Sequence, residues 1–231
     1  MIKTTAAYKE ALKEKGIFHH KAIIDFPDGS NDTVEDLDIY TFQISDGTSN
    51  TSSFDLGAAI AQQLTLKINN IDGRFDEHDF NGAVITVQVG LELLNGAVEW
   101  LDKGKFTAEP GEESGNSISV KAFDDMTKFD QPYSLSKLVY PATLGTIVRD
   151  ACSCCGVTLA SDTAAFDNNN FIVQNRPDDS ALTFRQVLQW VGQIACKFFR
   201  IDRFGKLSAR WYNTDLLEAT WVRKEDTIWA D

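Results

Sequence analysis

Four cysteines are the residues of this chain best suited to metal binding or nucleophilic chemistry. Three of them, Cys152, Cys154 and Cys155, crowd into one short stretch, and Cys196 stands apart. Tight metal sites usually space their ligands as C-x2-C or wider, and a helix would put Cys152 and Cys155 on one face but turn Cys154 away. Because cysteine that stays reduced in a cytoplasm often behaves as a small buried hydrophobe, we interpret the cluster as core residues.

The densest acidic run extends from Asp72 to Asp79, and a calcium loop is the chemistry it suggests. With Gly73 at the sixth position of an EF-hand loop, the first ligand position falls on Ile68, which cannot ligate a cation. The EF-hand interpretation therefore fails. The run instead predicts a solvated turn between strands over 64–68 and 84–89, and such a turn would also suit a contact between subunits.

The three histidines do not form a convincing ligand or nucleophile set. His19 and His20 are adjacent, and neighbouring residues of a strand face opposite ways, so they make a poor two-ligand site. His78 lies in the acidic run, far in sequence from the cysteines. A Cys–His nucleophile pair therefore has no specific spacing behind it.

Two carboxylate pairs, Glu112-Glu113 and Asp124-Asp125, raise the question of glycoside hydrolysis. That mechanism needs two carboxyl groups on facing surfaces of a cleft, one of them with a raised pKa. Adjacency in sequence does not supply this arrangement. Glu112-Glu113 falls in a Gly-rich hairpin loop and is expected to be solvated.

The sequence contains no phosphate loop, dinucleotide fingerprint, nucleophile elbow or HExxH motif. We therefore predict no catalytic residues, no cofactor-binding residues and no metal ligands, and we expect that the protein is not an enzyme.

Composition narrows the possible partners. The chain has 231 residues and a net charge of −12, from 34 acids and 22 bases. This charge argues against binding to a nucleic-acid backbone, which needs clustered Lys and Arg. An acidic wall would suit a channel through which DNA slides, although acidity can also serve solubility alone. There is no apolar run of roughly 20 residues and no apolar signal core at the N-terminus, so we expect no membrane insertion and assembly in the cytoplasm.

The first half of the sequence reads as a short helix followed by strands. A Thr start and a Gly16 stop predict a helix over 4–15, with Tyr8, Ala11 and Leu12 on one face. Asn95-Gly96 is a strong hairpin signal. Alternating or β-branched runs predict strands over 21–26, 37–44, 64–68, 84–91, 98–101, 105–108 and 117–123, with loops over 27–32, 46–50 and 110–116. Short strands at this spacing suggest a small β-barrel or sandwich.

The hydrophobic period changes after Pro141. Thr143 can cap a helix that ends at Gly156, and a loop over 162–170 and a short strand over 171–173 follow. A second helix comes after residues 178–180, and a hairpin is expected from 197–201 and 206–211. The predicted apolar helix faces comprise Leu144, Ile147, Val148, Ala151 and Cys155 in the first helix, and Phe184, Val187, Leu188, Val191 and Ala195 in the second.

These elements predict a fold that is mainly β with an α+β part. Residues 1–130 would form a β-barrel-like domain with a short N-terminal helix. Residues 131–231 would form an α+β domain of helix, strand, helix and hairpin. The end at Asp231 does not look like a domain terminus, which leaves open a truncated chain or a short family member.

Aromatic residues are expected mainly in the core. Examples at strand or helix core positions are Phe106, Phe123, Phe184 and Phe199. The late tryptophans, Trp211, Trp221 and Trp229, leave three alternatives open: a cap on the core, an interface, where aromatics are enriched, or a sugar-binding platform.

A series of segments follows one another in an order typical of a known family: 8–12, 21–24, 54–59, 79–85, 89–91, 101–107, 121–130, 140–144, 155–157 and 182–211. This order resembles phage and prophage tail proteins, in particular the N-terminal hub domains of siphophage-like baseplates. The resemblance covers most of the chain and rests on the order of the segments, because none of them is a catalytic signature.

This resemblance implies a homotrimeric baseplate hub, a ring that continues the tail tube and joins it to the distal tip. The implied partners are further copies and other tail proteins, with DNA passing through the lumen and no specific nucleic-acid binding. The implied location is the host cytoplasm during assembly and then the virion tail. Relatives with hydrolase or receptor-binding domains carry them in parts that this sequence lacks. The alternative is a carbohydrate-binding β module of a tail tip or cell-surface-recognition protein.

Overall fold

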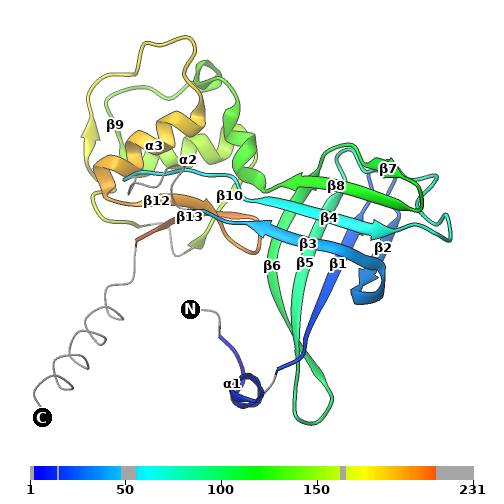
Figure 1. Cartoon of the computed structure of the whole chain (residues 1–231). Helices are drawn as coiled ribbons and strands as arrows, with labels where there is room; N and C mark the ends of the chain where they lie inside the picture. Colours follow the sequence, from blue (N-terminus) through cyan, green and yellow to red (C-terminus); the bar gives the residue numbers. More distant parts are fainter. Residues whose placement is uncertain (1–2, 15, 48–55, 162–164, 212–231) are drawn as a thin grey trace, which may run out of the picture.

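A long antiparallel sheet and a smaller unit with helices make up the computed structural model, which describes residues 3–14, 16–47, 56–161 and 165–211 (Figure 1). The strands of the sheet follow the order β2-β1-β5-β6-β8-β4-β3, with β7 beside β8. Their bounds are β1 (Phe18–Asp25), β2 (Asn31–Glu35), β3 (Ile39–Ser45), β4 (Gln63–Asn69), β5 (Val84–Glu92), β6 (Val98–Ala108), β7 (Glu112–Ser114) and β8 (Ser117–Phe123).

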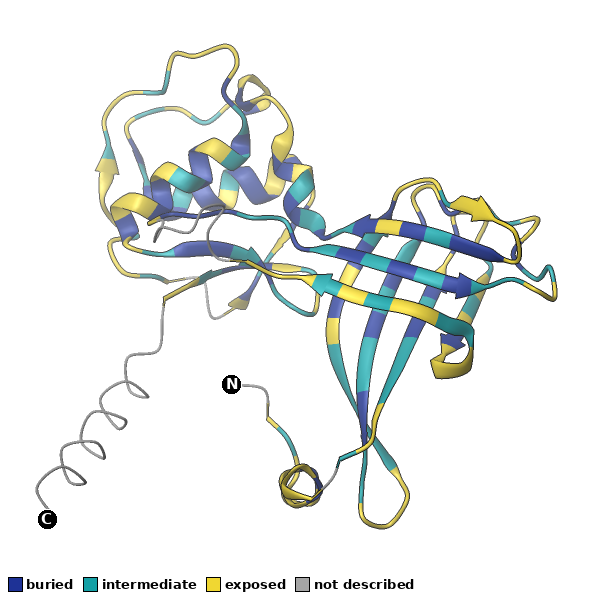
Figure 2. Ribbon diagram, in the orientation of Figure 1, coloured by how far each residue is buried: buried dark blue, intermediate teal, exposed yellow. Residues whose placement is uncertain are grey.

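Strand periodicity explains how the sheet forms its core. Leu64, Leu66 and Ile68 alternate with more exposed residues along β4, as the sequence predicts, because successive side chains of a strand face opposite ways. Figure 2 shows the same alternation of buried and less buried residues along neighbouring strands. The β5–β6 hairpin turns at Gly96, whose φ of 80° is easy only for glycine.

Three details of the predicted strands are wrong. The two strands expected over 98–101 and 105–108 are one strand, β6, because the ladder with β5 continues past an irregularity between Val87 and Gln88. The strands over 105–108 and 117–123 do pair with each other, through two residue pairs at the end of β6. Part of the loop expected over 110–116 forms β7, and part of the turn expected over 27–32 begins β2.

The mainly β fold class with an α+β part is confirmed, but the sheet is not a closed barrel. In the described ladders β2 pairs only with β1, and β3 pairs only with β4. A single 3-10 turn, η1 (Asp36–Asp38), connects these two edge strands. It joins the edges covalently at one end, and no β2–β3 ladder closes the sheet.

The smaller unit is built around two helices whose apolar faces match the predicted ones. Thr143 caps the first helix and Gly156 ends it in a left-handed conformation. Thr183 and Gln186 form a capping box at the second helix. The elements are η2 (Asp125–Asp130), η3 (Tyr133–Leu135), β9 (Ala142–Thr143), α2 (Leu144–Cys155), β10 (Thr158–Leu159), β11 (Ile172–Val173), α3 (Phe184–Ala195), β12 (Phe198–Ile201) and β13 (Lys206–Arg210).

Two large hydrophobic clusters form most of the interior, one inside the curved sheet and one around α2 and α3, and a small third cluster lies under α1. Two chain segments contribute to both large clusters. Ala59 packs in the helical cluster while β4 packs in the sheet cluster, and Met126 and Phe129 of η2 join the helical cluster directly after β8. A domain boundary at residue 130 remains a prediction.

The N-terminal helix is α1 (Ala6–Lys13), shorter than the predicted 4–15 and capped by Thr5. Tyr8 and Ala11 are buried against Leu91, as the predicted face requires, whereas Leu12 is exposed. Of the predicted core aromatics, Phe123 is only half-buried. No helix within the described ranges is long and apolar enough to cross a membrane.

Candidate assembly surface

The connection between β4 and β5, residues 70–83, is the most acidic surface feature; we call it the acidic connection. Its carboxylates at Asp72, Asp76, Glu77 and Asp79 are exposed, as predicted, and Ile71 beside them is 71% exposed. The acidic connection therefore exposes both negative charge and an apolar side chain to solvent.

Aromatic packing fixes this connection against the sheet. Phe75 and Phe80 are buried, and the Phe80 ring meets Phe26 edge-on at 5.2 Å between centroids. The His78 ring stacks on Phe26 at 4.3 Å. The connection is thus an anchored lid on the end of the sheet and not only the solvated turn that the sequence suggests. Pattern analysis missed the role of Phe75 and Phe80, although two phenylalanines in an acidic run were a usable signal.

Local hydrogen bonds and an ion pair complete the anchor. Asn70 donates from Nδ2 to Asp76 at 2.7 Å and accepts from the Phe75 backbone at 3.1 Å. Arg74 reaches Asp38 in η1 at 2.9 Å between Nη2 and Oδ2. These contacts hold the backbone of the acidic connection in one shape, so its exposed carboxylates are displayed from a defined frame.

The two adjacent histidines meet a carboxylate, although their rings lie toward different neighbours, His19 toward Trp100 and His20 toward Phe42. Both Nδ1 atoms reach Asp36, at 2.6 Å for His19 and 3.2 Å for His20. The Asp36 hydrogen bond raises the pKa of His19. Burial alone would raise the pKa of Asp36, but hydrogen bonds from the His20 backbone and the two rings lower it.

The cysteine cluster lies as its helical spacing predicts. Cys152 and Cys155 are buried on the inner face of α2, and Cys154 is exposed. Burial raises the pKa of both buried thiols to about 12, so they are protonated at neutral pH. Among the described residues, no three or more His, Cys, Asp or Glu side chains gather where they could hold a metal ion.

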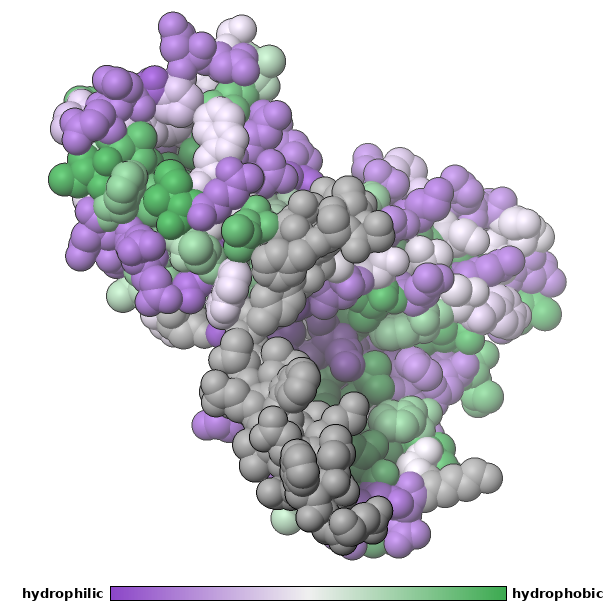
Figure 3. Space-filling model, turned by 60° about the vertical axis from the view of Figure 1, so that its left-hand side comes forward, coloured by the Kyte–Doolittle hydropathy of each residue, from purple (hydrophilic) through white to green (hydrophobic). Residues whose placement is uncertain are grey.

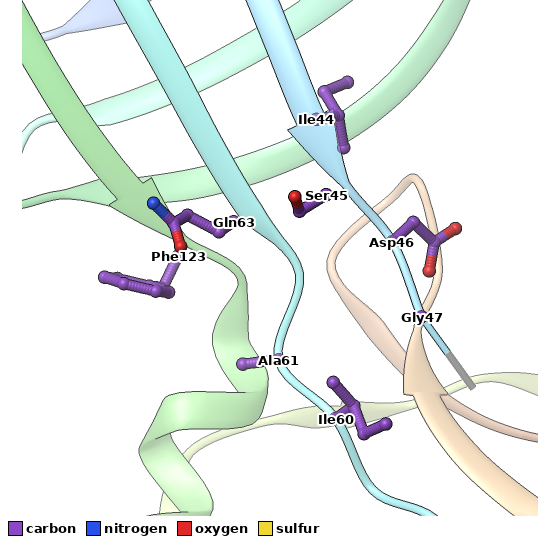
Figure 4. Close-up of a pocket in the computed structure, with 8 residues that line it drawn as sticks. All are labelled: Ile44, Ser45, Asp46, Gly47, Ile60, Ala61, Gln63 and Phe123. Carbon is purple, nitrogen blue, oxygen red and sulfur yellow. The ribbon is translucent and has the colours of Figure 1, made fainter. Parts of the chain in front are cut away.

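An open groove of about 510 Å³ lies where β3, β4 and β8 approach the smaller unit (Figure 4). Its one carboxylate, Asp46, already pairs with Arg200 at 2.6 Å. This lining brings no second ionisable side chain to serve as an acid–base partner. The lining residues are Ile44, Ser45, Asp46, Gly47, Ile60, Ala61, Gln63 and Phe123.

The smaller unit also exposes apolar side chains. Trp190 and Ile194 lie one turn apart on α3 and are 44% and 40% exposed, and Phe171 and Ile172 are about half exposed. Asn168 Nδ2 donates to the Ile194 carbonyl at 3.3 Å, which brings the segment before β11 next to α3. Figure 3 shows apolar side chains gathered on this unit. Such exposed apolar groups are common at contact surfaces.

The remaining sequence predictions concern the carboxylate pairs and the late tryptophans. Glu112 and Glu113 are exposed, as predicted, but on β7. Asp124 is buried and caps η2, whereas Asp125 pairs with Lys128 at 2.8 Å, so the two carboxylates do not share a cleft. Trp211 is 41% exposed. Trp221, Trp229 and residues 48–55 lie outside the described residues.

No protein-family model matches the chain, and no curated protein sequence matches it. Its fold is similar to the crystal structure of the 43 kDa tail protein of prophage MuSo2 from Shewanella oneidensis, with a TM-score of 0.55 and 13% sequence identity. The similarity covers 84% of this chain and 55% of that protein. At this identity the likeness is one of fold, and the chain spans about half the length of its structural neighbour.

Proposed function

We propose that this protein is a structural component of a phage or prophage tail, and that its copies assemble into a ring at the baseplate hub. The observation that carries this proposal is the fold, shared over 84% of the chain with a prophage tail protein. The ordered segments that resemble tail proteins in the sequence point in the same direction.

The proposed role is assembly and passage, without catalysis. Neighbouring copies and other tail proteins would be the partners, and DNA would pass through the lumen without specific binding. The net charge of −12 supports this role, since an acidic surface repels phosphates. The location that follows is the host cytoplasm during assembly and then the virion tail.

The exposed side chains support a role in assembly better than a role in catalysis. A subunit of a larger particle needs surfaces that lose water on contact, and Trp190 and Ile194 provide one. The free edges of β2 and β3 are a second feature that pairing with another chain can use.

The test is the mass of the purified chain by light scattering after size exclusion, followed by negative-stain imaging. We expect a trimer or a ring with a central hole. A chain that stays monomeric and is absent from purified tails would contradict the proposal. If that monomer also retained an oligosaccharide, a carbohydrate-binding module would be the better description.

A further inference from the structure

Unpaired cations gather on one surface of this acidic protein. Lys103, Lys105 and Lys206 are exposed, Arg203 is partly exposed, and none of the four pairs with an acid in the described part of the chain. Some other bases, such as Lys197 with Asp167 at 2.8 Å, do have acidic partners. We call these four residues, together with Phe204, the basic surface.

The β12–β13 turn, which carries Arg203 and leads into Lys206, lies against Lys105 of β6, two residues after Lys103. Gly205 lies against β6, since a Cβ built on it would come 3.7 Å from the Lys105 Cδ atom. Phe204 is 55% exposed, and the Arg203 guanidinium lies 4.7 Å from the centre of its ring. The surface therefore combines positive charge with an exposed aromatic ring.

The nearby carboxylates are already engaged. Asp202 accepts hydrogen bonds from the backbone amides of Phe204 and Lys206, both at 2.9 Å. Asp102 accepts from Gln88 at 2.8 Å. Neither forms an ion pair with the cations of the basic surface, so no carboxylate among the described residues neutralises these cations.

The acidic connection has the complementary properties. It exposes four carboxylates and Ile71, and Phe75 and Phe80 hold its backbone in place. Figure 1 places it at the far end of the sheet from the β12–β13 turn. The two surfaces therefore cannot meet within one chain.

We propose that copies of this chain join head to tail, with the acidic connection of one copy docked on the basic surface of the next. The charges match in sign, and Ile71 and Phe204 supply apolar contact on the two sides. A contact between two different surfaces generates a ring when the rotation closes. This proposal deepens the proposed function and rests on its self-assembly.

A second copy fits the basic surface better than nucleic acid does. The complementary acids belong to the same chain, and they are displayed on an anchored frame beside an exposed apolar residue. Phosphate binding needs cations alone, and the chain around these four carries a net charge of −12.

The experiment reverses the charge of each surface separately and then the charges of both surfaces together. Sedimentation velocity at about 50 mM salt, where screening of surface charges is weak, would compare three variants of the full chain with wild type. The first is Arg203→Glu/Lys206→Glu, the second is Asp72→Lys/Glu77→Lys, and the third combines all four changes. We expect each double variant to weaken self-association about 100-fold through like-charge repulsion. We expect the combined variant to recover most of it.

A matched control separates the effect of charge at the proposed contact from the effect of net charge. Lys9→Glu/Lys137→Glu changes the net charge by as much as the first variant, and both lysines are exposed and belong to neither surface. We expect it to associate like wild type, and far-ultraviolet circular dichroism would establish that every variant is folded.

Three results would overturn the contact. If the wild-type protein assembles and both double variants form assemblies of the same mass, this contact is excluded, and the tail-assembly proposal still stands. Loss in both variants without recovery in the combined one would exclude direct pairing of the two surfaces. Wild type that stays monomeric at every concentration would remove self-association from the proposed function as well. A fourth measurement compares the binding of wild type and the first variant to duplex DNA. If the variant binds DNA more weakly but assembles to the same mass as wild type, the basic surface is a phosphate site, and that result would also overturn the contact.

Discussion

At the residue scale, the carboxylate of Asp124 is the least expected charge in the molecule. It is 2% exposed where β8 ends, and its Oδ1 accepts a hydrogen bond from the Met126 backbone at 3.0 Å, which caps η2. Burial raises the pKa of Asp124 from 3.8 to about 6. The same side chain thus organises a turn and carries an energetic penalty when it ionises.

This penalty has a defined direction with pH. The unfolded chain loses the Asp124 proton near its ordinary pKa of 3.8, but the folded chain keeps it up to about pH 6. Between these values the folded state binds more protons, so the stability of the folded state falls as pH rises. We expect Asp124→Asn to remove that fall, an effect of at most about 3 kcal/mol at pH 7 relative to pH 4.

Urea unfolding of wild type and Asp124→Asn at several pH values is the measurement. Asp28 and Asp36 have lowered pKa values and act in the opposite direction, but they are present in both proteins and cancel in the difference. Glu113→Gln removes an exposed carboxylate and controls for charge. A wild type–variant difference that stays constant with pH would contradict the assignment.

At the element scale, the segment leading into β4 crosses α3 at two glycines. A Cβ on Gly57 would lie 2.3 Å from the Gln189 carbonyl oxygen, and one on Gly192 would lie 2.7 Å from the Gly57 Cα atom. Gly57 also has a φ of 80°. The two backbones can therefore approach this closely only because neither carries a side chain.

We expect Gly192→Ala to destabilise the protein by roughly 1–3 kcal/mol through overpacking. Helix propensity alone predicts the opposite sign, since alanine favours a helix over glycine by about 1 kcal/mol. Gly145→Ala in α2 is the matched control, because its Cβ would meet its nearest atom at an ordinary 3.4 Å. Thermal unfolding of both variants decides the matter, and equal stabilisation at the two sites would show that the crossing is looser than described.

At the scale of the whole molecule, the two hydrophobic clusters share chain segments. The segment from Ala59 through β4 serves both, as does the segment from β8 into η2. The backbone of Phe199 also donates to the Ala58 carbonyl at 2.8 Å. If one cluster unfolds, the other cluster therefore loses the packing contacts of the shared segments.

We consequently expect one cooperative unfolding transition, with calorimetric and van't Hoff enthalpies equal. Differential scanning calorimetry tests this directly. Arg200→Ala removes only the partly exposed ion pair with Asp46 and should leave a single transition. Two resolved transitions in wild type would instead support independent domains that meet near residue 130.

Much of the local structure was predictable because it depends on neighbouring residues. The period of Leu144, Ile147 and Val148 predicts the buried face of α2, and the β4 alternation predicts which side of that strand is buried. The exposure of the acidic run followed from its composition. The anchoring of that run could not be predicted, because Phe75 and Phe80 contact Phe26, which is more than 45 residues away in the sequence.

By itself, then, the sequence determined where the three helices lie, the Thr143 and Gly156 caps of α2, most of the strands and the chain's acidity. Periodicity, turn residues and charge are properties of short stretches. Only the tertiary structure decided that β2 and β3 leave the sheet open, that two glycines let the segment before β4 cross α3, and that four cations with no acidic partner among the described residues lie far from the acidic connection. These features depend on strand order and on contacts between residues far apart in the chain. No local pattern encodes them, because strand partners and charge neighbours that are far apart in the sequence meet only after the chain has folded.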